Sequence, residues 1–116
     1  MSFLEMSDDA LWQIANPLMD HLMEASTQRD HGEHCRDFTE RMKAIVTPEH
    51  LHRVCEAYQR EKGRFTEREP VAVFKRTDSV ALVWRQRFSR AEGDFVAEMV
   101  LVHRNGRYLV DHAMVF

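Results

Sequence analysis

The sequence predicts an α+β fold in which N-terminal helices pack on a curved antiparallel four-stranded sheet. Apolar residues recur at helical spacing up to about residue 62, and from residue 65 the period changes to two. The chain has 116 residues, which suits one domain over residues 1–116 with a core that needs no metal or disulfide.

The expected helices cover residues 8–30, 33–45 and 48–62. Ser7 precedes two aspartates and is the predicted cap of the first helix. Pro17 interrupts its apolar stripe, so we expect a bend or a restart there. Thr47 and Pro48 mark the start of the third helix. Gly63 follows its last turn and is expected in the left-handed conformation that ends a helix.

The expected strands cover residues 65–75, 79–88, 95–104 and 107–116. Pro70 lies inside the first strand and has no N–H to donate, which places that strand at an edge or predicts a bulge there. Asn105-Gly106 is a strong signal for a two-residue hairpin turn between the last two strands. A longer turn around Gly93 is expected between the second and third strands.

The two hairpin turns predict a register for the last three strands. Met99 is expected opposite Trp84 on one side and opposite His112 on the other. On the reverse face, Arg85 is expected beside Glu98. Because side chains alternate along a strand, this register assigns each residue to one face of the sheet.

The face assigned to the helices carries polar residues among apolar ones, and a buried polar group needs a hydrogen-bond partner. These residues are either satisfied core residues or the lining of a pocket for a small apolar ligand. The candidate ligand-binding residues are Tyr58, Trp84, Gln86, Met99 and His112.

The opposite face is half apolar, and no predicted helix remains to cover it. Arg85, Glu98 and Asp111 are expected there among valines such as Val100. Such charges are either a solvated stabilising set or the groups that orient a protein interface. We predict that these four residues form an interface, with a second copy of the chain as the simplest partner.

Composition argues against several classes of function. The net charge is −3 with both signs interspersed, unlike the basic surface of nucleic-acid-binding proteins. No apolar stretch approaches the roughly 20 residues that span a bilayer, and no secretory leader is visible, so a cytoplasmic protein is expected. Cys35 and Cys55 lie on apolar stripes without a recognised metal-binding spacing, and we predict no metal and no cofactor.

Several short motifs accompany the helix–sheet order, namely residues 29–33 (Arg-Asp-His-Gly-Glu), 38–43 (Phe-Thr-Glu-Arg-Met-Lys), 47–49 (Thr-Pro-Glu) and 63–65 (Gly-Arg-Phe). Over residues 17–116 the chain resembles a small bacterial branch of uncharacterised proteins in the cystatin-like, nuclear-transport-factor-2-like superfamily. The resemblance implies a cone-shaped fold with a cavity between helices and sheet, and frequent homodimers. It implies no chemistry, because this scaffold carries isomerases, dehydratases, transport adaptors and binding modules.

We therefore expect a non-catalytic small-molecule-binding or protein-interaction module that is homodimeric through its sheet. Two alternatives stay open. The first is a small cofactor-free isomerase or hydrolase in which His112 acts as a general base in the cavity. The second is an adaptor that docks another protein on the sheet face turned away from the helices.

Overall fold

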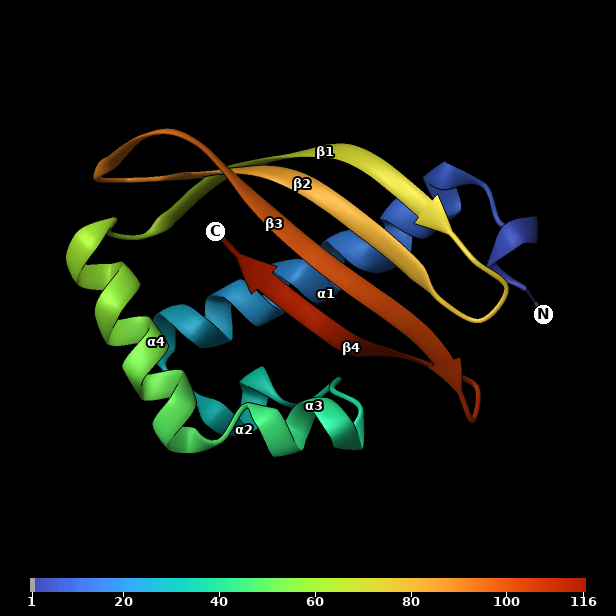
Figure 1. Ribbon diagram of the computed structural model, residues 1–116, viewed down its shortest axis with the longest axis horizontal. Coiled ribbons are helices and arrows are strands. Elements are labelled where there is room, and N and C mark those ends of the chain that lie inside the picture. The colour runs from blue at the N-terminus through green and yellow to red at the C-terminus, as the bar shows by residue number, and fades with distance from the viewer. Residues whose placement is uncertain (1) are drawn as a thin grey trace.

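The computed structural model describes residues 2–116 as helices packed on one face of a four-stranded antiparallel sheet (Figure 1). The helical elements are η1 (Phe3–Glu5), α1 (Asp8–Gln28), α2 (His31–His34), α3 (Glu40–Ile45) and α4 (Pro48–Glu61). The strands are β1 (Phe65–Lys75), β2 (Val80–Phe88), β3 (Ala91–Arg104) and β4 (Arg107–Val115), in the spatial order β1-β2-β3-β4. The predicted fold class is confirmed.

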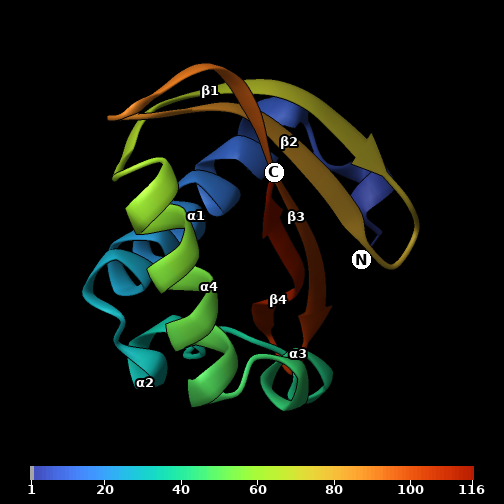
Figure 2. The ribbon, with the colours of Figure 1, turned by 60° about the vertical axis from the view of Figure 1, so that its left-hand side comes forward.

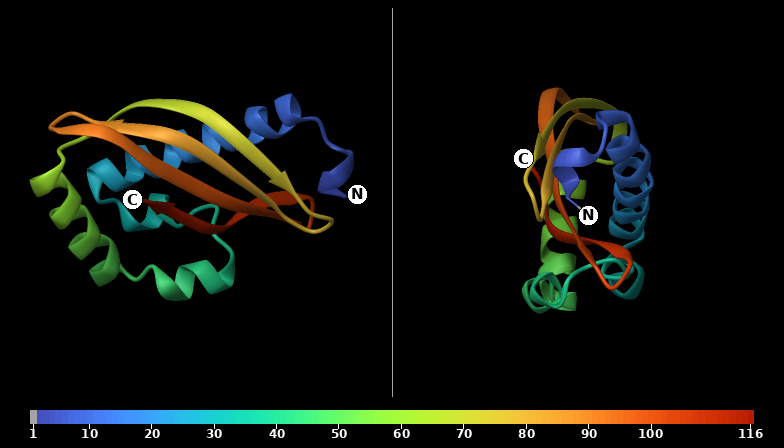
Figure 3. Two further views of the ribbon diagram at one scale, coloured as in Figure 1. Left: turned by 45° about the horizontal axis from the view of Figure 1, so that its top comes forward. Right: turned by 90° about the vertical axis from the view of Figure 1, so that its right-hand side faces the viewer.

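The helices leave one face of the described sheet uncovered. Figure 3 shows α1 running along one side of the sheet, with no helix on the other side. The core lies between α1 and the sheet and includes Leu11, Met19, Leu82 and Leu101, all fully buried. Within residues 2–116 no helix has the length and apolar content that crossing a membrane requires.

The first helix is continuous through Pro17 and does not restart there. Leu11 and Ala15 on one side of the proline and Met19 on the other are fully buried, so packing holds the helix together across it. The helix ends two residues before the predicted boundary. Arg29 adopts a left-handed conformation with φ of 54°, and the next residue caps α2.

The predicted helix over residues 33–45 is wrong. The chain forms two short helices, α2 and α3, separated by an extended segment, residues 37–39, that lies beside β4. The Val110 N–H donates to the Asp37 carbonyl at 2.7 Å, and the Thr39 N–H donates to the Val110 carbonyl at 3.0 Å. Phe38 is buried between these two bonds, which long-range packing favours over helical propensity.

The register between β2 and β3 differs from the prediction by two residues. The turn occupies residues 89–90, so β3 begins earlier than expected. Trp84 lies opposite Ala97, and Met99 lies opposite Leu82. Because the shift is even, each of these side chains stays on the predicted face of the sheet.

The register between β3 and β4 follows the predicted turn at residues 105–106 and then departs from it. A bulge at Asp111 inserts one extra residue into β4. Beyond it His112 lies opposite Val100, not opposite Met99 as predicted. A slip of one residue exchanges the two faces of a strand, so His112 points away from the helices.

The position of β1 agrees with the proline argument. It is an edge strand, and its pairing with β2 shifts register between Pro70 and Ala72. The prediction of an edge position or a bulge at Pro70 is therefore confirmed on both counts.

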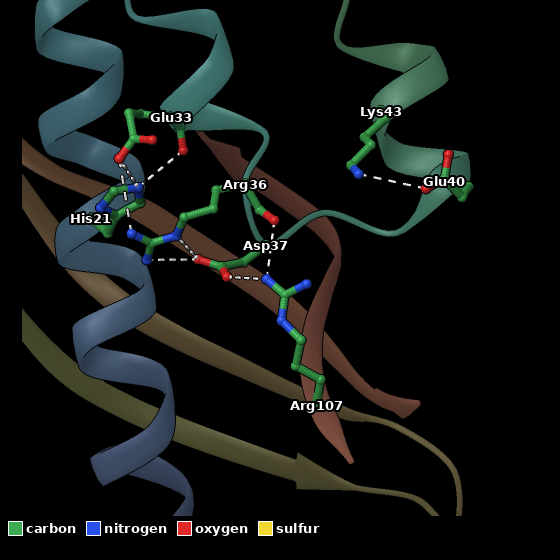
Figure 4. A network of polar contacts seen from close by, with 7 residues as sticks. All are labelled: His21, Glu33, Arg36, Asp37, Glu40, Lys43 and Arg107. Atoms are coloured by element: carbon green, nitrogen blue, oxygen red, sulfur yellow. Dashed lines mark hydrogen bonds and ion pairs between the residues drawn. The ribbon is translucent and has the colours of Figure 1, made fainter. Parts of the chain in front are cut away.

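An arginine clamp holds the residues before α3 against β4. Asp37 accepts hydrogen bonds from Arg36 at 2.9 and 3.1 Å and from Arg107 at 2.7 Å (Figure 4). Burial alone opposes ionisation of this carboxyl, but the two arginines outweigh it and hold the pKa of Asp37 below its usual range.

The bulge residue makes a second link to the same region. Asp111 accepts hydrogen bonds from the Thr39 hydroxyl at 2.8 Å and from Arg41 at 3.2 Å. Its partial burial opposes ionisation, and these two donors outweigh it, so the pKa of Asp111 is also lowered. The bulge is thus stabilised by contacts with a segment some 70 residues earlier in the chain.

The lowered pKa values of Asp37 and Asp111 predict that the protein loses stability in acid. A group whose pKa is lower in the folded state stabilises fully above its unfolded-state pKa, near 4 for aspartate, and that contribution is lost as the pH falls through the folded value. We expect the free energy of unfolding to decline below about pH 4. In the Asp37→Asn, Asp111→Asn double variant the decline should be shallower. Urea unfolding at pH 2.5, 4 and 7 measures this, and equal pH slopes in both proteins would contradict it.

Candidate functional site

A cavity of about 380 Å³ lies between α4 and the C-terminal end of β4. Figure 2 shows α4 standing across from this part of the strand. One wall is the face of α4 that carries Leu51, Val54 and Tyr58, which share a helix face because they are spaced three and four apart. The other wall is the strand segment Ala113–Val115. The remaining lining comes from Leu22, Met23, Ser26, His34, Phe38, Met42, Val46, His50, Lys62, Phe65 and Phe88.

Tyr58 brings a hydroxyl to the cavity that already has a partner. Its Oη lies 2.8 Å from the Ser26 Oγ, and the Cys55 Sγ lies 3.3 Å from the same Ser26 oxygen. Burial raises the pKa of the Tyr58 phenol, so the side chain is neutral at pH 7. The tyrosine therefore offers an apolar ring and a hydrogen-bonding tip.

His34 is a neutral lining residue at physiological pH. Burial, together with the neighbouring imidazoles of His31, His21 and His50, lowers the pKa of His34 to about 4. Its Nδ1 is buried and has no hydrogen-bond partner within residues 2–116. An uncharged imidazole suits a cavity whose other walls are mostly apolar.

Lys62 follows the last residue of α4 and supplies the positive charge of the cavity lining. Its ammonium lies 5.6 Å from the ring centroid of Phe88 and 4.9 Å from that of Phe95. Both distances are within the range of a cation–π interaction. Within the described residues Lys62 forms no ion pair, so its charge remains available to a guest of the cavity.

The lining holds no oriented acid–base pair in the part of the chain that the structure describes. Neither His34 nor His50 lies within 4.0 Å of a carboxylate there, and such a partner is what usually orients a general base. Histidine, cysteine and acidic residues form no group of three that could hold a metal ion among residues 2–116. The cavity thus offers shape, apolar surface and a few hydrogen-bonding groups.

Comparisons with known proteins connect this architecture to one fold. No protein-family model and no curated protein matches the chain. An NTF2-like protein of unknown function from Methylobacillus flagellatus aligns with a TM-score of 0.61 at 8% identity, over 99% of this chain and 97% of that one. A second, from Pseudomonas putida, aligns with a TM-score of 0.59 at 14% identity, over 95% and 88%.

The protein has the NTF2-like fold. A putative calcium/calmodulin-dependent protein kinase type II association domain from Thiobacillus denitrificans also aligns, with a TM-score of 0.59 at 10% identity over 86% of this chain and 91% of that one. These findings confirm the fold that the sequence resemblance implied. Identities this low relate the chains by fold alone, so the function of this protein has to be argued from its site.

The structure separates the five predicted ligand-binding residues. Tyr58 lines the cavity, whereas Trp84, Gln86 and Met99 are buried in the core and do not line it. The Trp84 indole N–H donates to the Asn16 side chain at 2.8 Å. Gln86 donates to backbone carbonyls at 2.8 to 3.4 Å. The Trp84 indole thus follows the alternative in which the protein satisfies a buried polar group. The Gln86 amide nitrogen is satisfied as well, whereas its Oε1 is buried and has no hydrogen-bond partner within residues 2–116.

The expected cavity position of His112 is wrong, because the bulge at Asp111 reverses its face. His112 lies on the uncovered face of the NTF2-like sheet, and its Nε2 is 2.9 Å from a carboxylate oxygen of Glu98. Side chains of both residues are about one-third exposed, at 37% and 34%. An enzyme that uses His112 inside the cavity is therefore incompatible with this register.

The four predicted interface residues do not form one cluster on the uncovered face. Glu98 and Val100 face the uncovered side, but Arg85 is not beside Glu98 as predicted, since Val83 takes that position. Arg85 instead pairs with Glu69 at 3.7 Å and Asp94 at 3.3 Å. Asp111 is committed to α3 through its bonds to Thr39 and Arg41. The charges assigned to an interface are thus mostly engaged within the chain.

Sequence reasoning missed the strand wall of the cavity. Ala113 and Val115 were placed on the uncovered face by the predicted register, and the bulge turns them toward the helices. The apolar stripe of α4 was visible in the sequence, but its partner wall was not. A bulge leaves no local signature here, because its stabilising contacts come from distant residues.

Proposed function

We propose that this NTF2-like protein is a non-catalytic binding module whose cavity takes a small apolar guest. The observation that carries the proposal is the composition of the lining, in which apolar and aromatic side chains surround a few polar groups. Small-molecule sites have this composition and a volume of about 300–1,000 Å³. The lack of a carboxylate beside either lining imidazole in the described chain favours binding over acid–base catalysis.

Filling the cavity tests this proposal. Ala113 points toward the helices from the strand wall, so Ala113→Phe places an aromatic ring in the cavity. We expect titration with an environment-sensitive naphthalene dye to show saturable binding by the wild-type protein, and binding at least about tenfold weaker in the variant. Fluorescence titration and isothermal calorimetry measure the two dissociation constants.

A matched substitution separates cavity filling from general perturbation. Ala72 lies on the uncovered face, opposite Val83, so Ala72→Phe adds the same ring outside the cavity. This control should bind the dye as the wild type does. Equal dye affinity in Ala113→Phe and the wild type, or no saturable binding by the wild type, would contradict the proposal.

A second candidate property is homodimerisation through the uncovered sheet face. The apolar residues Phe74, Met114 and Phe116 are 52 to 57% exposed, and the pairing of β1, β3 and β4 puts all three on this face. Apolar patches on a sheet face without covering helices mark protein interaction sites. The Glu98–His112 pair lies within the patch and supplies polar groups for orientation.

Val100→Glu is the test of this interface. Val100 lies near the middle of the uncovered face, opposite Ala81 on one side and His112 on the other. We expect the wild type to sediment as a dimer at about 50 μM and the variant as a monomer, because an uncompensated buried charge costs several kcal/mol. Ile45→Glu, at an exposed apolar residue on α3 away from this face, should leave the dimer intact. A monomeric wild type would instead leave the face free for a different protein.

A further inference from the structure

The strand wall of the cavity is formed by the edge of β4. Ala113, Met114 and Val115 all border the cavity, although neighbouring side chains in a strand point to opposite faces. Three consecutive residues border one space only where the backbone edge itself is exposed to it. β4 is the last strand of the sheet order, so that edge has no neighbouring strand within the described chain beyond residue 111.

The hydrogen-bond pattern shows which backbone groups point into the cavity. Val96 and Phe116 exchange both backbone bonds, at 2.6 and 2.9 Å. In an antiparallel pair, the residues next to such a pair direct their N–H and C=O groups away from the partner strand. Val115, and by the same alternation Ala113, therefore present free donors and acceptors to the cavity. These groups point away from β3, and no other part of residues 2–116 donates to them or accepts from them.

The same edge already pairs with another extended segment at Val110, three residues before Ala113. Residues 37–39 run parallel to β4 and bond both the N–H and the C=O of Val110, and the Asp37–Arg107 contact in Figure 4 holds them there. The chain then leaves the edge, because α3 begins at Glu40. The space that a continued fifth strand would occupy is the cavity.

The opposite wall has the length and spacing that an extended guest requires. Along α4 the lining runs from His50 to Lys62, about 18 Å at 1.5 Å per residue. That distance accommodates about five residues of extended chain at roughly 3.3 Å each. Leu51, Val54 and Tyr58 face the strand edge across this space and offer apolar contacts for alternate side chains.

The charge of the lining favours an acidic guest. Lys62 stands at one end of the wall and His50 at the other, and no aspartate or glutamate of residues 2–116 lines the cavity. Lys62 therefore complements by its charge a carboxylate at one end of a short apolar segment. At the other end His50 accepts from Arg53 at Nδ1 and can donate its other ring N–H to a second carboxylate.

We propose that the natural guest of the cavity is an extended peptide segment, apolar at alternate positions and flanked by carboxylates, that adds to the free edge of β4. The inference rests on the proposed function, because it names the guest of the same cavity. It follows the strand-addition mode of recognition, in which backbone bonds provide affinity and the groove selects alternate side chains. The other sheet edge is blunted by Pro70 and two register shifts in β1, which protect an edge from added strands.

Amide exchange tests the proposal with a defined probe, the pentapeptide acetyl-Glu-Val-Thr-Val-Glu-amide. We expect saturable binding that slows exchange of the Ala113 and Val115 amides by at least about tenfold. The same peptide N-methylated at alternate residues lacks the donors on one edge and should bind at least about tenfold more weakly. Protection confined to β1, or equal affinity of the two peptides, would overturn the proposal.

A pair of variants tests the protein side of the same bonds. Val115→Pro removes the N–H that points into the cavity and leaves the ladder to β3 intact, because that N–H is not part of it. Val115→Thr keeps the N–H and the branched shape. We expect the proline variant to bind the peptide about tenfold more weakly than the threonine variant, and equal affinities of the two variants would contradict the predicted bonds. Circular dichroism checks that both variants fold.

The naphthalene dye separates the two levels of inference. Dye binding that the probe peptide displaces supports both. Dye binding with no change of the Ala113 and Val115 amides at millimolar peptide overturns strand addition and leaves the apolar cavity proposal standing. Binding of neither overturns both.

Discussion

Replacing Trp84 with alanine is expected to lower the free energy of unfolding by about 3–5 kcal/mol, the usual cost of removing a buried indole. The side chain is 1% exposed and packs edge-on against Trp12 with ring centroids 5.2 Å apart. The Arg68 guanidinium lies 5.6 Å from its ring, and the indole N–H bonds Asn16. Trp84 therefore links the middle of β2 to α1, and its loss leaves a cavity and an unpaired amide.

Urea unfolding followed by circular dichroism measures this change. Trp84→Phe is the matched control, since it keeps most of the ring packing and removes the bond to Asn16, and it should cost about 1–2 kcal/mol. An alanine variant that loses less than about 1 kcal/mol would contradict the role of Trp84 in the core. Because Trp84 does not line the cavity, the dye affinity of the folded Phe variant should equal that of the wild type.

Gly63→Val is expected to cost about 3 kcal/mol, because a β-branched residue at positive φ is strained and crowded at this site. Gly63 has a φ of 86°, as the sequence predicted for the end of α4. A Cβ built there would lie 2.3 Å from the Ser89 Oγ and 3.1 Å from the Arg90 Nε. Ser89 cannot easily retreat, since its Oγ accepts from the Arg64 N–H and its own N–H donates to the Arg64 carbonyl, both at 2.9 Å.

Gly106→Val is the matched control for this prediction. Gly106 has a similar φ of 75°, but nothing lies within 4 Å of an added Cβ. Both variants are destabilised by a side chain at positive φ, and only Gly63→Val is also destabilised by the clash. Urea unfolding of the two gives the difference, which we expect to be at least about 1 kcal/mol. Equal losses would show that the approach of Ser89 is unimportant. Since this turn orients α4, the Gly63 variant should also bind the dye more weakly.

Short-range signals in the sequence predicted the features that depend on neighbouring residues. Ser7 and Thr47 each accept a backbone N–H three residues on, as helix caps should. The turn at residues 105–106 has both residues at positive φ, which asparagine and glycine adopt most readily. Pro70 lies in an edge strand at a bulge, because its missing N–H leaves few alternatives.

Distant contacts explain the predictions that were wrong. The break in the expected second helix is stabilised by Val110, more than 70 residues later, and no periodicity within residues 33–45 reveals it. The bulge at Asp111 is held by Thr39 and Arg41 in the same way. One such bulge reversed the faces of the residues after it, and with them the candidate site.

Short-range pattern was enough for the α+β class, the helix caps and the hairpin turn, since each depends on the local conformational preferences of a few residues. The resemblance to the NTF2-like superfamily was carried by short motifs. The cavity, the exclusion of His112 from it and the free edge of β4 required the tertiary structure. The physical reason is that strand register depends on competing long-range contacts, here between Asp111 and the segment before α3. A shift of a single residue decides which side chains and which backbone groups face the cavity.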